Sequence, residues 1–430
     1  MMRKKGQGIK LRAAHHVPDQ WSVSPYAWDP RVRKRMPNIP KKVLIRDVTL
    51  REGEEMPGAR MTVHDKVEIA RRLVDMGVQE IELGYVGALE QQREALKAIK
   101  KAGLKVATAA ICRWYVKNWK EEIDLAVEAG ADRIKIQTLG GPDWKYPVYP
   151  YDYYDFYKKG KIIPGMVDAV RYVKDHYHSF VHIGLTDGPR TDLNWMKKFF
   201  SAGVKAGVDR VSFHDGLGAT LPIVMQYLAE EVKRVVGDIP VLVHNHNDFG
   251  LATANTIGAV LGGVEGCDVT VNGMGDRSGN ASLEEVVTCL EMLCGVKTGI
   301  DMTQLYALSK YVEKVTGVKC QPHKAIVGEN AFLEESELHI HGVMKGKDVD
   351  LGDLAYLPYA PSVVGQRHKI VWGTTSLWGS AIKLKMEQLG LNPSQENMEK
   401  VRKALQRELK GKDNLTDEEF NKLCKSILKR

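Results

Sequence analysis

The stretch "PVLVHNHNDFG", residues 240–250, begins as an apolar strand and ends in two histidines, two asparagines and an aspartate. Alternate residues of a strand point to the same side, so His244 and His246 project together. Polar groups that are buried without partners are costly, which leaves two interpretations of this pair. The imidazoles either hydrogen-bond to carbonyl groups of the protein or hold a divalent metal ion at the end of the strand.

This strand is one of eight similar segments along the chain. We predict strands at residues 43–47, 79–84, 105–110, 132–138, 180–186, 209–215, 240–246 and 267–273. Amphipathic helical patterns such as 64–77 and 118–130 lie between them, and many end at a glycine suited to a helix C-cap. Eight such units predict an α/β fold of the (β/α)8 TIM-barrel type. A doubly wound sheet is the alternative, but it does not need eight evenly spaced units, and no GxGxxG motif follows the first strand.

Polar side chains gather where these strands end. They are Arg46, Asp47, Glu82, Thr186, His214, Asp215, His244 and His246. Active sites of TIM barrels lie at the C-terminal ends of the strands. Strands that served only the core would have no reason to become polar at the same end each time, so the pattern predicts a catalytic site there.

Three parts of the chain follow from composition and pattern. Residues 1–42 form a basic N-terminal extension with eleven lysines and arginines against two aspartates, which accounts for the net charge of +8. Residues 43–300 form the barrel, and residues 301–430 form a mainly helical C-terminal subdomain. The extension has no nucleic-acid-binding motif and contains aromatic residues and prolines, so we expect it to pack along its own protein or a partner subunit. No apolar run is long enough to cross a membrane, and no signal peptide is recognisable, so we expect a cytoplasmic protein.

The segment 141–165, after the fourth predicted strand, is unusually long and aromatic. It contains six tyrosines, one tryptophan and one phenylalanine. Long loops in compact domains commonly act as lids or binding loops. A lid over the site and a subunit interface are equally consistent with this composition.

Three motifs together resemble a known family. They are "RDVTLREGEE" (46–55), "HNHNDFG" (244–250) and "TVNGMGDRSGNASLEEVV" (270–287). The glycines of the third motif fit neither a Walker A sequence nor a dinucleotide fingerprint, and they are better explained by a tight bend that returns Asn280 to the barrel mouth. The three motifs resemble the TIM-barrel metal-dependent acyltransferases and lyases, which include isopropylmalate synthase, homocitrate synthase and hydroxymethylglutaryl-CoA lyase. The likeness covers residues 43–295, with a weaker continuation to about residue 385.

The resemblance implies a metal site and its chemistry. One divalent ion (Zn, Mn, Mg or Co) would be held by Asp47, His244, His246 and Asn280, and Arg46 would stabilise a developing enolate or alkoxide. Such a ligand set leaves open positions for a substrate's carbonyl and carboxylate, and the metal would polarise that carbonyl. The implied reaction is a Claisen-type condensation of an acyl-CoA, with acetyl-CoA expected, and a 2-oxo acid. The resemblance also implies small-molecule substrates and a homodimer, with no nucleic-acid or membrane partner.

Two segments favour the condensing synthases over the lyases. The lyases carry Asp-Thr after the second histidine and a cysteine in the glycine loop, and this chain has neither. The segment "GENAFLEESELHIHG" (328–342) resembles the synthases' "NAFxHxSGIH", which places His339 where they carry an active-site histidine. A lyase running the reverse cleavage and a non-catalytic, regulatory barrel remain alternatives.

Several positions depart from the synthase pattern. Thr186 stands in the place of a catalytic glutamate, and Gly216 in the place of a threonine that holds the oxo-acid carboxylate. The synthases' Arg-Asp-Gly-Glu-Gln is represented here by residues 51–55, "REGEE". Because Thr186 cannot take a proton near neutral pH, we expect His339, oriented by Glu334 or Glu337, to act as the base, with His214 as the alternative.

The substrate pocket is therefore predicted to differ from that of the synthases. The predicted substrate-binding residues are Glu82, Thr186, Arg190, Gly216 and Thr270. Thr186 and Gly216 enlarge the space near the metal and reduce its negative charge. We therefore expect a bulkier or dianionic oxo acid, whose extra charge meets Arg190 and a lysine or tyrosine of segment 141–165. His214 could equally be a core histidine, and Glu82 could be the partner of a helix.

Overall fold

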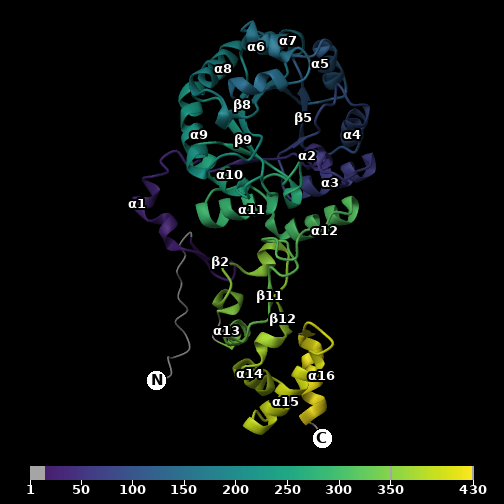
Figure 1. Cartoon of the computed structure of the whole chain (residues 1–430), viewed down its shortest axis with the longest axis vertical. Helices are drawn as coiled ribbons and strands as arrows, with labels where there is room; N and C mark the ends of the chain where they lie inside the picture. Colours follow the sequence, from purple (N-terminus) through teal and green to yellow (C-terminus); the bar gives the residue numbers. More distant parts are fainter. Residues whose placement is uncertain (1–14, 349–350, 429–430) are drawn as a thin grey trace. The chain divides into compact units, whose positions relative to one another are not determined.

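The computed structural model describes residues 15–348 and 351–428, so the first fourteen residues of the predicted N-terminal extension lie outside the described part of the chain. The chain divides into two compact units (Figure 1). One unit runs from Tyr26 to Lys319, and the other combines Met1–Pro25 with Cys320–Arg430. The predicted boundaries at residues 42 and 300 both fall inside the first unit.

The first unit is a closed barrel of parallel strands in the order β10-β3-β4-β5-β6-β7-β8-β9. The predicted (β/α)8 fold is therefore confirmed. The strands are β3 (Leu44–Asp47), β4 (Glu80–Glu82), β5 (Ala107–Cys112), β6 (Arg133–Thr138), β7 (Phe180–Leu185), β8 (Arg210–Asp215), β9 (Val241–Asn245) and β10 (Gly266–Val269).

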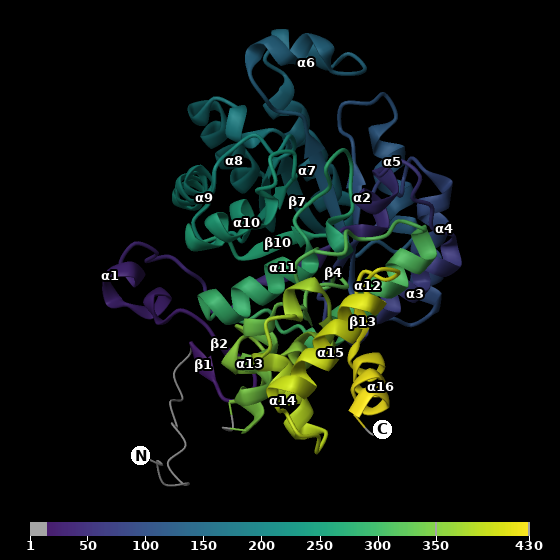
Figure 2. The ribbon, with the colours of Figure 1, turned by 60° about the horizontal axis from the view of Figure 1, so that its bottom comes forward.

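Helices surround the strands on the outside of the barrel (Figures 1 and 2). The helices of this unit are α1 (Pro30–Arg33), α2 (Thr49–Glu55), α3 (Val63–Asp75), α4 (Glu90–Lys101), α5 (Trp119–Glu128), α6 (Tyr153–Lys158), α7 (Ile162–Tyr177), α8 (Leu193–Ala206), α9 (Pro222–Val236), α10 (Ala252–Leu261), α11 (Leu283–Thr288) and α12 (Leu305–Thr316), of which α1 stands apart from the barrel and α2 lies at its end. Short 3-10 turns are η1 (Pro25–Trp28), η2 (Asp143–Val148), η3 (Gly188–Arg190), η4 (Val271–Gly273) and η6 (Met302–Gln304), and η5 (Cys289–Cys294) is a π-helix.

Local sequence signals explain where these helices begin and end. Thr62 and Asp65 form a reciprocal capping box at the start of α3, with the Asp65 amide donating to the Thr62 hydroxyl at 3.2 Å. This arrangement satisfies backbone N–H groups that the helix leaves free. Asp192 caps α8 by accepting from the Trp195 amide at 2.8 Å, and the helix ends at Gly207 in the left-handed region (φ 92°). Such caps set the residues at which these helices begin and end.

The register of the strands places the polar ends at one level of the barrel. His214 on β8 lies opposite His244 on β9, and Asp268 on β10 lies opposite Arg46 on β3. Side chains that share a level and face the interior can touch across the barrel. The register thus brings together residues that are up to 222 positions apart.

The eighth strand is shorter than predicted. It ends at Val269 instead of residue 273, because Val271–Gly273 turn as a 3-10 segment with Asn272 in the left-handed region (φ 62°). The chain then returns, and the Asn280 amide donates to the Gly273 carbonyl at 3.0 Å. Asn280 also forms an isolated β-bridge with His246. The predicted tight bend is present, and it brings Asn280 to the end of β9.

The second unit has its own sheet and core. Its strands are β1 (His16–Val17), β2 (Trp21–Ser22), β11 (Leu333–Glu334), β12 (Lys369–Trp372) and β13 (Leu415–Thr416), of which the last three form one sheet. Its helices are α13 (Glu337–Asp348), α14 (Ser380–Gln388), α15 (Gln395–Glu408) and α16 (Asp417–Leu428), with 3-10 turns η7 (Gly352–Ala355), η8 (Pro361–Val364) and η9 (Thr374–Ser376). The buried rings of Trp372 and Phe420 stack with centroids 3.8 Å apart at the centre of this core.

None of the helices in residues 15–348 and 351–428 is both long and apolar enough to cross a bilayer.

Candidate metal centre and active site

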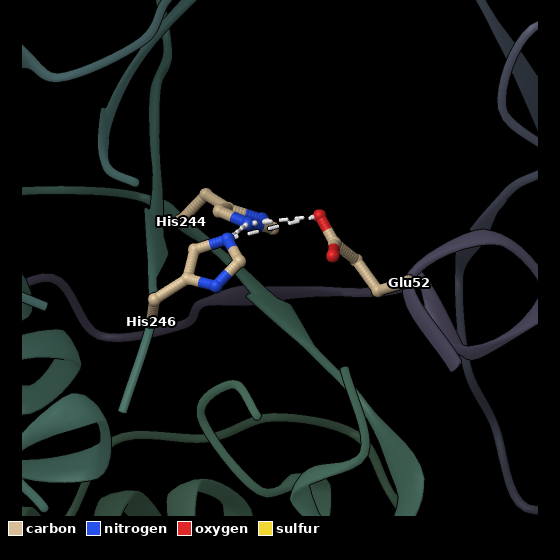
Figure 3. Close-up of side chains that lie close together, drawn as sticks. All are labelled: Glu52, His244 and His246. Atoms are coloured by element: carbon tan, nitrogen blue, oxygen red, sulfur yellow. Dashed lines mark hydrogen bonds and ion pairs between the residues drawn. The ribbon is translucent and has the colours of Figure 1, made fainter. Parts of the chain in front are cut away.

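Three buried side chains converge at the C-terminal end of the barrel: His244, His246 and Glu52 (Figure 3). The Nε2 atoms of the two histidines are 3.2 Å apart. Oε1 of Glu52 lies 3.2 Å from the His244 Nε2 and 4.0 Å from the His246 Nε2. Three potential ligand atoms thus face one another.

The backbone explains this convergence. Strand β9 ends at Asn245, so its alternation sends His244 and His246 to the same side and Asn245 to the other. Helix α2 begins two residues after β3 ends, which carries Glu52 over the same end of the barrel. Each of the two histidines faces the other and a carboxylate, and among the described residues neither Nε2 is turned to a backbone carbonyl.

Asn280 completes the cluster. Its side-chain Nδ2 lies 3.1 Å from the His244 Nε2. Within the described residues, the buried atoms Asn280 Oδ1, Glu52 Oε2 and His246 Nδ1 have no hydrogen-bond partner. Rotating the Asn280 amide by half a turn would point its oxygen at the histidines. Two imidazoles, a carboxylate and an amide oxygen are a donor set that suits a divalent transition metal, so the residues fit such an ion.

The charges of the cluster depend strongly on one another. Burial alone would raise the pKa of Glu52, but the adjacent Arg51 and the two histidines hold it well below its usual value. Burial and the neighbouring His244 lower the pKa of His246 to about 3. Burial acts to lower the pKa of His244, but its contacts with Asp268 and Glu52 raise it. A metal ion binds imidazoles in their neutral form, so metal binding would displace a proton from His244.

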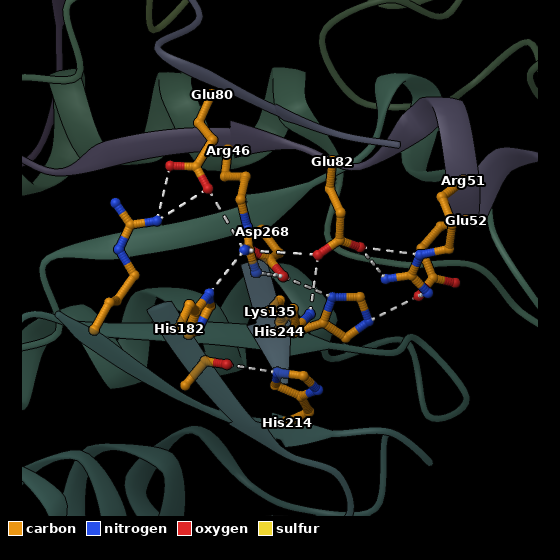
Figure 4. Close-up of polar contacts among 12 residues, drawn as sticks. Arg46, Arg51, Glu52, Glu80, Glu82, Lys135, His182, His214, His244 and Asp268 are labelled. Atoms are coloured by element: carbon orange, nitrogen blue, oxygen red, sulfur yellow. Dashed lines mark hydrogen bonds and ion pairs between the residues drawn. The ribbon is translucent and has the colours of Figure 1, made fainter. Parts of the chain in front are cut away.

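The buried carboxylate of Asp268 orients His244 through the Nδ1 atom of the ring (Figure 4). Asp268 Oδ2 lies 3.1 Å from the His244 Nδ1, and both Asp268 oxygens accept from Arg46, at 2.7 Å each. All three side chains are almost fully buried. A carboxylate can only accept, so this contact favours a proton on Nδ1 of His244, whose Nε2 faces Glu52 and His246 and is the atom placed to bind a metal.

Two of the predicted site residues lie outside the cluster and the cavity. Asp47 is not in the convergent cluster, because its carboxylate accepts from the amide of Thr49 (2.9 Å) and its hydroxyl (3.0 Å) at the start of α2. Arg46 does not line the cavity that adjoins the cluster. Its guanidinium contacts Asp268 and the His182 Nδ1 (3.1 Å) instead. The positions expected for these two residues are taken by Glu52 and Arg51.

Arg51 is the arginine beside the cluster. Its Nε and Nη2 donate to Oε1 of Glu82, at 3.0 and 2.6 Å, and its Nη1 contacts Glu52. Glu82 also accepts from the buried Lys135 at 3.0 Å, and these cations, against the effect of burial, lower the pKa of Glu82 to about 2. Glu82, predicted to bind substrate, instead fixes Arg51 with its guanidinium at the cavity.

The sequence contained the signal for both residues. The synthase motif Arg-Asp-Gly-Glu-Gln matches residues 51–55, whereas the prediction assigned the ligand roles to the similar Arg-Asp pair that ends the strand. The two pairs differ in position by five residues, and only the later pair lies on α2.

A cavity of about 230 Å³ adjoins the cluster. Of the predicted residues, His214, Thr186, Gly216, His244 and His246 line it. Arg190, Glu82 and Thr270 do not line it. Arg190 is paired with Asp187 instead, and Thr270 is fully buried where the chain leaves β10.

His214 Nε2 lies 2.8 Å from the Ser212 hydroxyl, and the ring of His214 is 5.1 Å from that of His244. Burial and the charge of Lys135 lower the pKa of His214 well below its usual value.

The aromatic segment 141–165 contributes to the same cavity. Lys145 and Tyr149 line it, as do Asp187 and Arg277, which were not predicted. The hydroxyl of Tyr153 donates to the Leu139 carbonyl at 2.6 Å, so the segment is fixed where it leaves β6. These contacts favour the binding-loop interpretation of the segment.

His339 belongs to the second unit. Its Nδ1 lies 3.0 Å from Glu334 Oε2, and its ring is 5.1 Å from that of Tyr356. Glu337, the other predicted partner, accepts from the Ser380 and Ala381 amides at the start of α14. Glu334 is therefore the carboxylate that orients His339, which is half exposed.

Comparison with known proteins agrees with this architecture. The family model described as HMGL-like matches residues 42–312, which include the whole barrel and every residue of the convergent cluster. The chain belongs to the HMGL-like family. The resemblance inferred from the motifs is thereby confirmed.

Curated relatives of this HMGL-like chain are synthases. It is 39% identical over 355 residues to the 2-isopropylmalate synthase of Methanocaldococcus jannaschii, an alignment that covers 82% of this chain and 65% of the relative's length. It is 32% identical over 409 residues to the homocitrate synthase of Methanothermobacter thermautotrophicus, which covers 95% of this chain and 98% of that protein. These relatives differ in the products for which they are named.

Among solved structures, the HMG-CoA lyase of Bacillus subtilis shares the fold. The TM-score is 0.54 at 20% identity, and the match covers 66% of this chain and 96% of that one. At this identity the similarity establishes the fold alone.

Proposed function

We propose that this chain catalyses the metal-dependent condensation of an acyl-CoA, with acetyl-CoA the expected donor, and a 2-oxo acid. Water then hydrolyses the thioester that forms, which gives a 2-hydroxy-2-carboxymethyl acid and CoA. The single observation that carries the proposal is the convergence of Glu52, His244 and His246 beside Arg51 at the cavity. The synthase relatives support a condensing enzyme, and they leave the oxo acid open.

The proposal assigns the metal to Glu52, His244, His246 and Asn280. A bound divalent ion would act as a Lewis acid toward the carbonyl of the 2-oxo acid. The chain's own part is to present these donors with Nε2 of His244 unprotonated, which its contact with Asp268 favours. The bridge between His246 and Asn280 keeps the two ligands in one place.

Arg51 would stabilise negative charge that develops on oxygen. Its guanidinium is held by Glu82 and Glu52, so it does not need to reorganise when that charge appears. A preorganised cation of this kind in a site shielded from water is a large contributor to catalysis. We therefore assign to Arg51 the role that the sequence had suggested for Arg46.

A base must remove a proton from the acyl group, and His339 is our candidate. Glu334 binds its Nδ1, which leaves Nε2 free to accept a proton. His214, which lines the cavity, is the alternative. A His339→Ala variant that keeps full turnover would exclude His339, and His214→Ala tests the alternative in the same assay.

The deciding experiment is release of CoA from acetyl-CoA by the full chain with added Mn²⁺ or Zn²⁺. A panel of 2-oxo acids serves as acceptors, and mass spectrometry identifies the product. We expect CoA release that depends on both metal and oxo acid, and that is lost in His244→Ala but kept in His176→Ala, a change at a histidine on α7 outside the cavity. Cleavage of a 3-hydroxyacyl thioester without condensation would favour a lyase. No turnover in either direction would favour a regulatory barrel.

A further inference from the structure

One wall of the cavity carries an unusual ion cluster. The Lys145 Nζ lies 2.7 Å from Asp187 Oδ2, and Arg190 binds the same carboxylate through Nε (2.8 Å) and Nη2 (2.6 Å). Asp187 is 1% exposed and lies in the left-handed region (φ 53°), in the turn that follows β7. Two cations therefore share a single buried carboxylate.

This arrangement leaves positive charge at the cavity. Arg190 already satisfies both oxygens of Asp187, so the charge of Lys145 is only partly balanced. Lys145 lines the cavity, whereas Arg190 does not. An ammonium group has three donors, and the contact with Asp187 uses one of them, which leaves two for a ligand.

The other cations that line the cavity are balanced differently. Arg51 contacts Glu82, Glu52 and Glu55, and Arg277 contacts Asp248 (2.7 Å) and Asp276 (2.6 Å). Each of these arginines has at least two carboxylate partners. Asp215, behind the same wall, accepts from the Ala219 amide at 2.8 Å. Of the three lysines and arginines that line the cavity in the described part of the chain, Lys145 alone has a single carboxylate partner, and it shares that carboxylate with Arg190.

Two glycines leave room for a ligand beside this cluster. A Cβ added to Gly216 would find only the Asp187 amide within 4 Å, at 3.9 Å, so the space there is open. Gly141 (φ 135°) lets the aromatic segment pass close to Asp187, because a Cβ there would lie 2.8 Å from Asp187 Oδ2. Its amide donates to the Thr191 hydroxyl at 2.8 Å, which fixes the segment that carries Lys145.

We propose that Lys145 binds the distal carboxylate of a dianionic 2-oxo acid and so sets the substrate class of this site. The inference rests on the proposed function, which places the 2-oxo group of the substrate at the metal. The ion cluster at Asp187 is the evidence for a binding site for the distal carboxylate. Lys145 acts here as a specificity residue and takes no part in the chemical step.

The test measures binding by calorimetry to the full chain loaded with Mn²⁺. The probes are 2-oxoglutarate, which carries a distal carboxylate, and 2-oxoisovalerate, which does not. We expect Lys145→Gln to weaken binding of 2-oxoglutarate by roughly tenfold or more, the usual effect of losing a charged hydrogen bond, and to change 2-oxoisovalerate by less than about twofold. Lys145→Arg should retain part of the preference.

The matched control is Lys158→Gln. Lys158 lies in the same aromatic segment and is half exposed, and it pairs with Asp155 at 2.8 Å outside the cavity. This variant should bind both probes as the unchanged chain does. The unfolding midpoint of each variant verifies that it is folded.

The outcomes separate this inference from the proposed function. Equal effects of Lys145→Gln on both probes, or none on either, would overturn the role of Lys145 even if CoA is released with other oxo acids. A selective loss of 2-oxoglutarate binding without CoA release from any oxo acid would support Lys145 and refute the condensation.

Discussion

Arg46 and Asp268 form a fully buried pair in which two hydrogen bonds, each of 2.7 Å, join the guanidinium to the carboxylate. The two residues also lie opposite each other in the β3–β10 register. The same carboxylate contacts the His244 Nδ1, so the pair links the barrel interior to the metal cluster. Arg46 therefore influences the metal cluster indirectly, because it fixes Asp268, the residue that orients His244.

The first prediction concerns this link. Asp268→Asn should lower metal affinity by about 10- to 100-fold, because an amide can turn its NH₂ toward His244 and no longer selects the Nδ1 proton. Competition with a chelating dye measures the affinity. Asp132→Asn, which changes an aspartate bound to Lys100 and Thr108, is the control and should leave affinity unchanged. Unaltered metal binding in Asp268→Asn would remove the positioning role.

The second prediction distinguishes the two acidic candidates near α2. Glu52→Gln should lose most of the bound metal, since its Oε1 faces both Nε2 atoms. Asp47→Asn should keep the metal and lower the free energy of unfolding by about 1 kcal/mol, because its contacts are to Thr49. Elemental analysis and urea unfolding of both variants measure these effects. The reverse pattern would restore Asp47 as the ligand.

The sequence predicted the barrel because eight strand-like segments alternate with amphipathic helical patterns, and each of these patterns is local. It also predicted His244 and His246, since alternation along one strand fixes their common side. Glu52 was missed for a physical reason. Whether the Arg-Asp pair of β3 or the Arg-Glu pair of α2 reaches the cluster depends on where the strand ends, and the bond from Thr49 to Asp47 sets that point. Lys145 was anticipated only as an unspecified lysine of segment 141–165, because its reach into the cavity depends on the path of the chain at Gly141.

The third prediction concerns pH. Burial acts to raise the pKa of Asp187, but Arg190 and Lys145 hold it below its usual value. A depressed pKa contributes stability that is present above about pH 4, the range of an unperturbed aspartate, and is lost as the pH falls through the folded-state pKa. The gap in unfolding free energy between the unchanged chain and Asp187→Asn should therefore narrow below about pH 4. Urea unfolding at several pH values measures it, and a gap that is constant or widens in acid would contradict the assigned cause.

The fourth prediction concerns the aromatic segment. Lys145 and Tyr149 line the cavity, so a bound oxo acid adds contacts that oppose local opening of residues 141–165. Trypsin should cleave after Lys158 and Lys159, both exposed, more slowly when substrate and metal are present. Cleavage after Lys403 on α15 in the second unit is the internal control. Mass spectrometry of the fragments separates the sites, and equal rates with and without substrate would argue against a binding loop.

The last prediction concerns Gly216. A Cβ added here would have only the Asp187 amide within 4 Å, at 3.9 Å, so we expect Gly216→Thr to fold with little change in stability. The added side chain would fill space beside the Lys145–Asp187 pair and offer a hydroxyl to the carboxylate next to the oxo group. Smaller, monoanionic oxo acids should then gain relative to dianionic ones, by roughly tenfold in the ratio of their kcat/KM values. Competition between pyruvate and 2-oxoglutarate in one reaction measures that ratio directly.

The control for this prediction is Ala202→Thr on the half-exposed surface of α8, which adds side-chain volume away from the cavity. Gly207→Thr is not a suitable control, because Gly207 has a φ of 92° and a threonine there would strain the backbone. If Gly216→Thr and Ala202→Thr show the same ratio as the unchanged chain, the open space at residue 216 does not select the substrate.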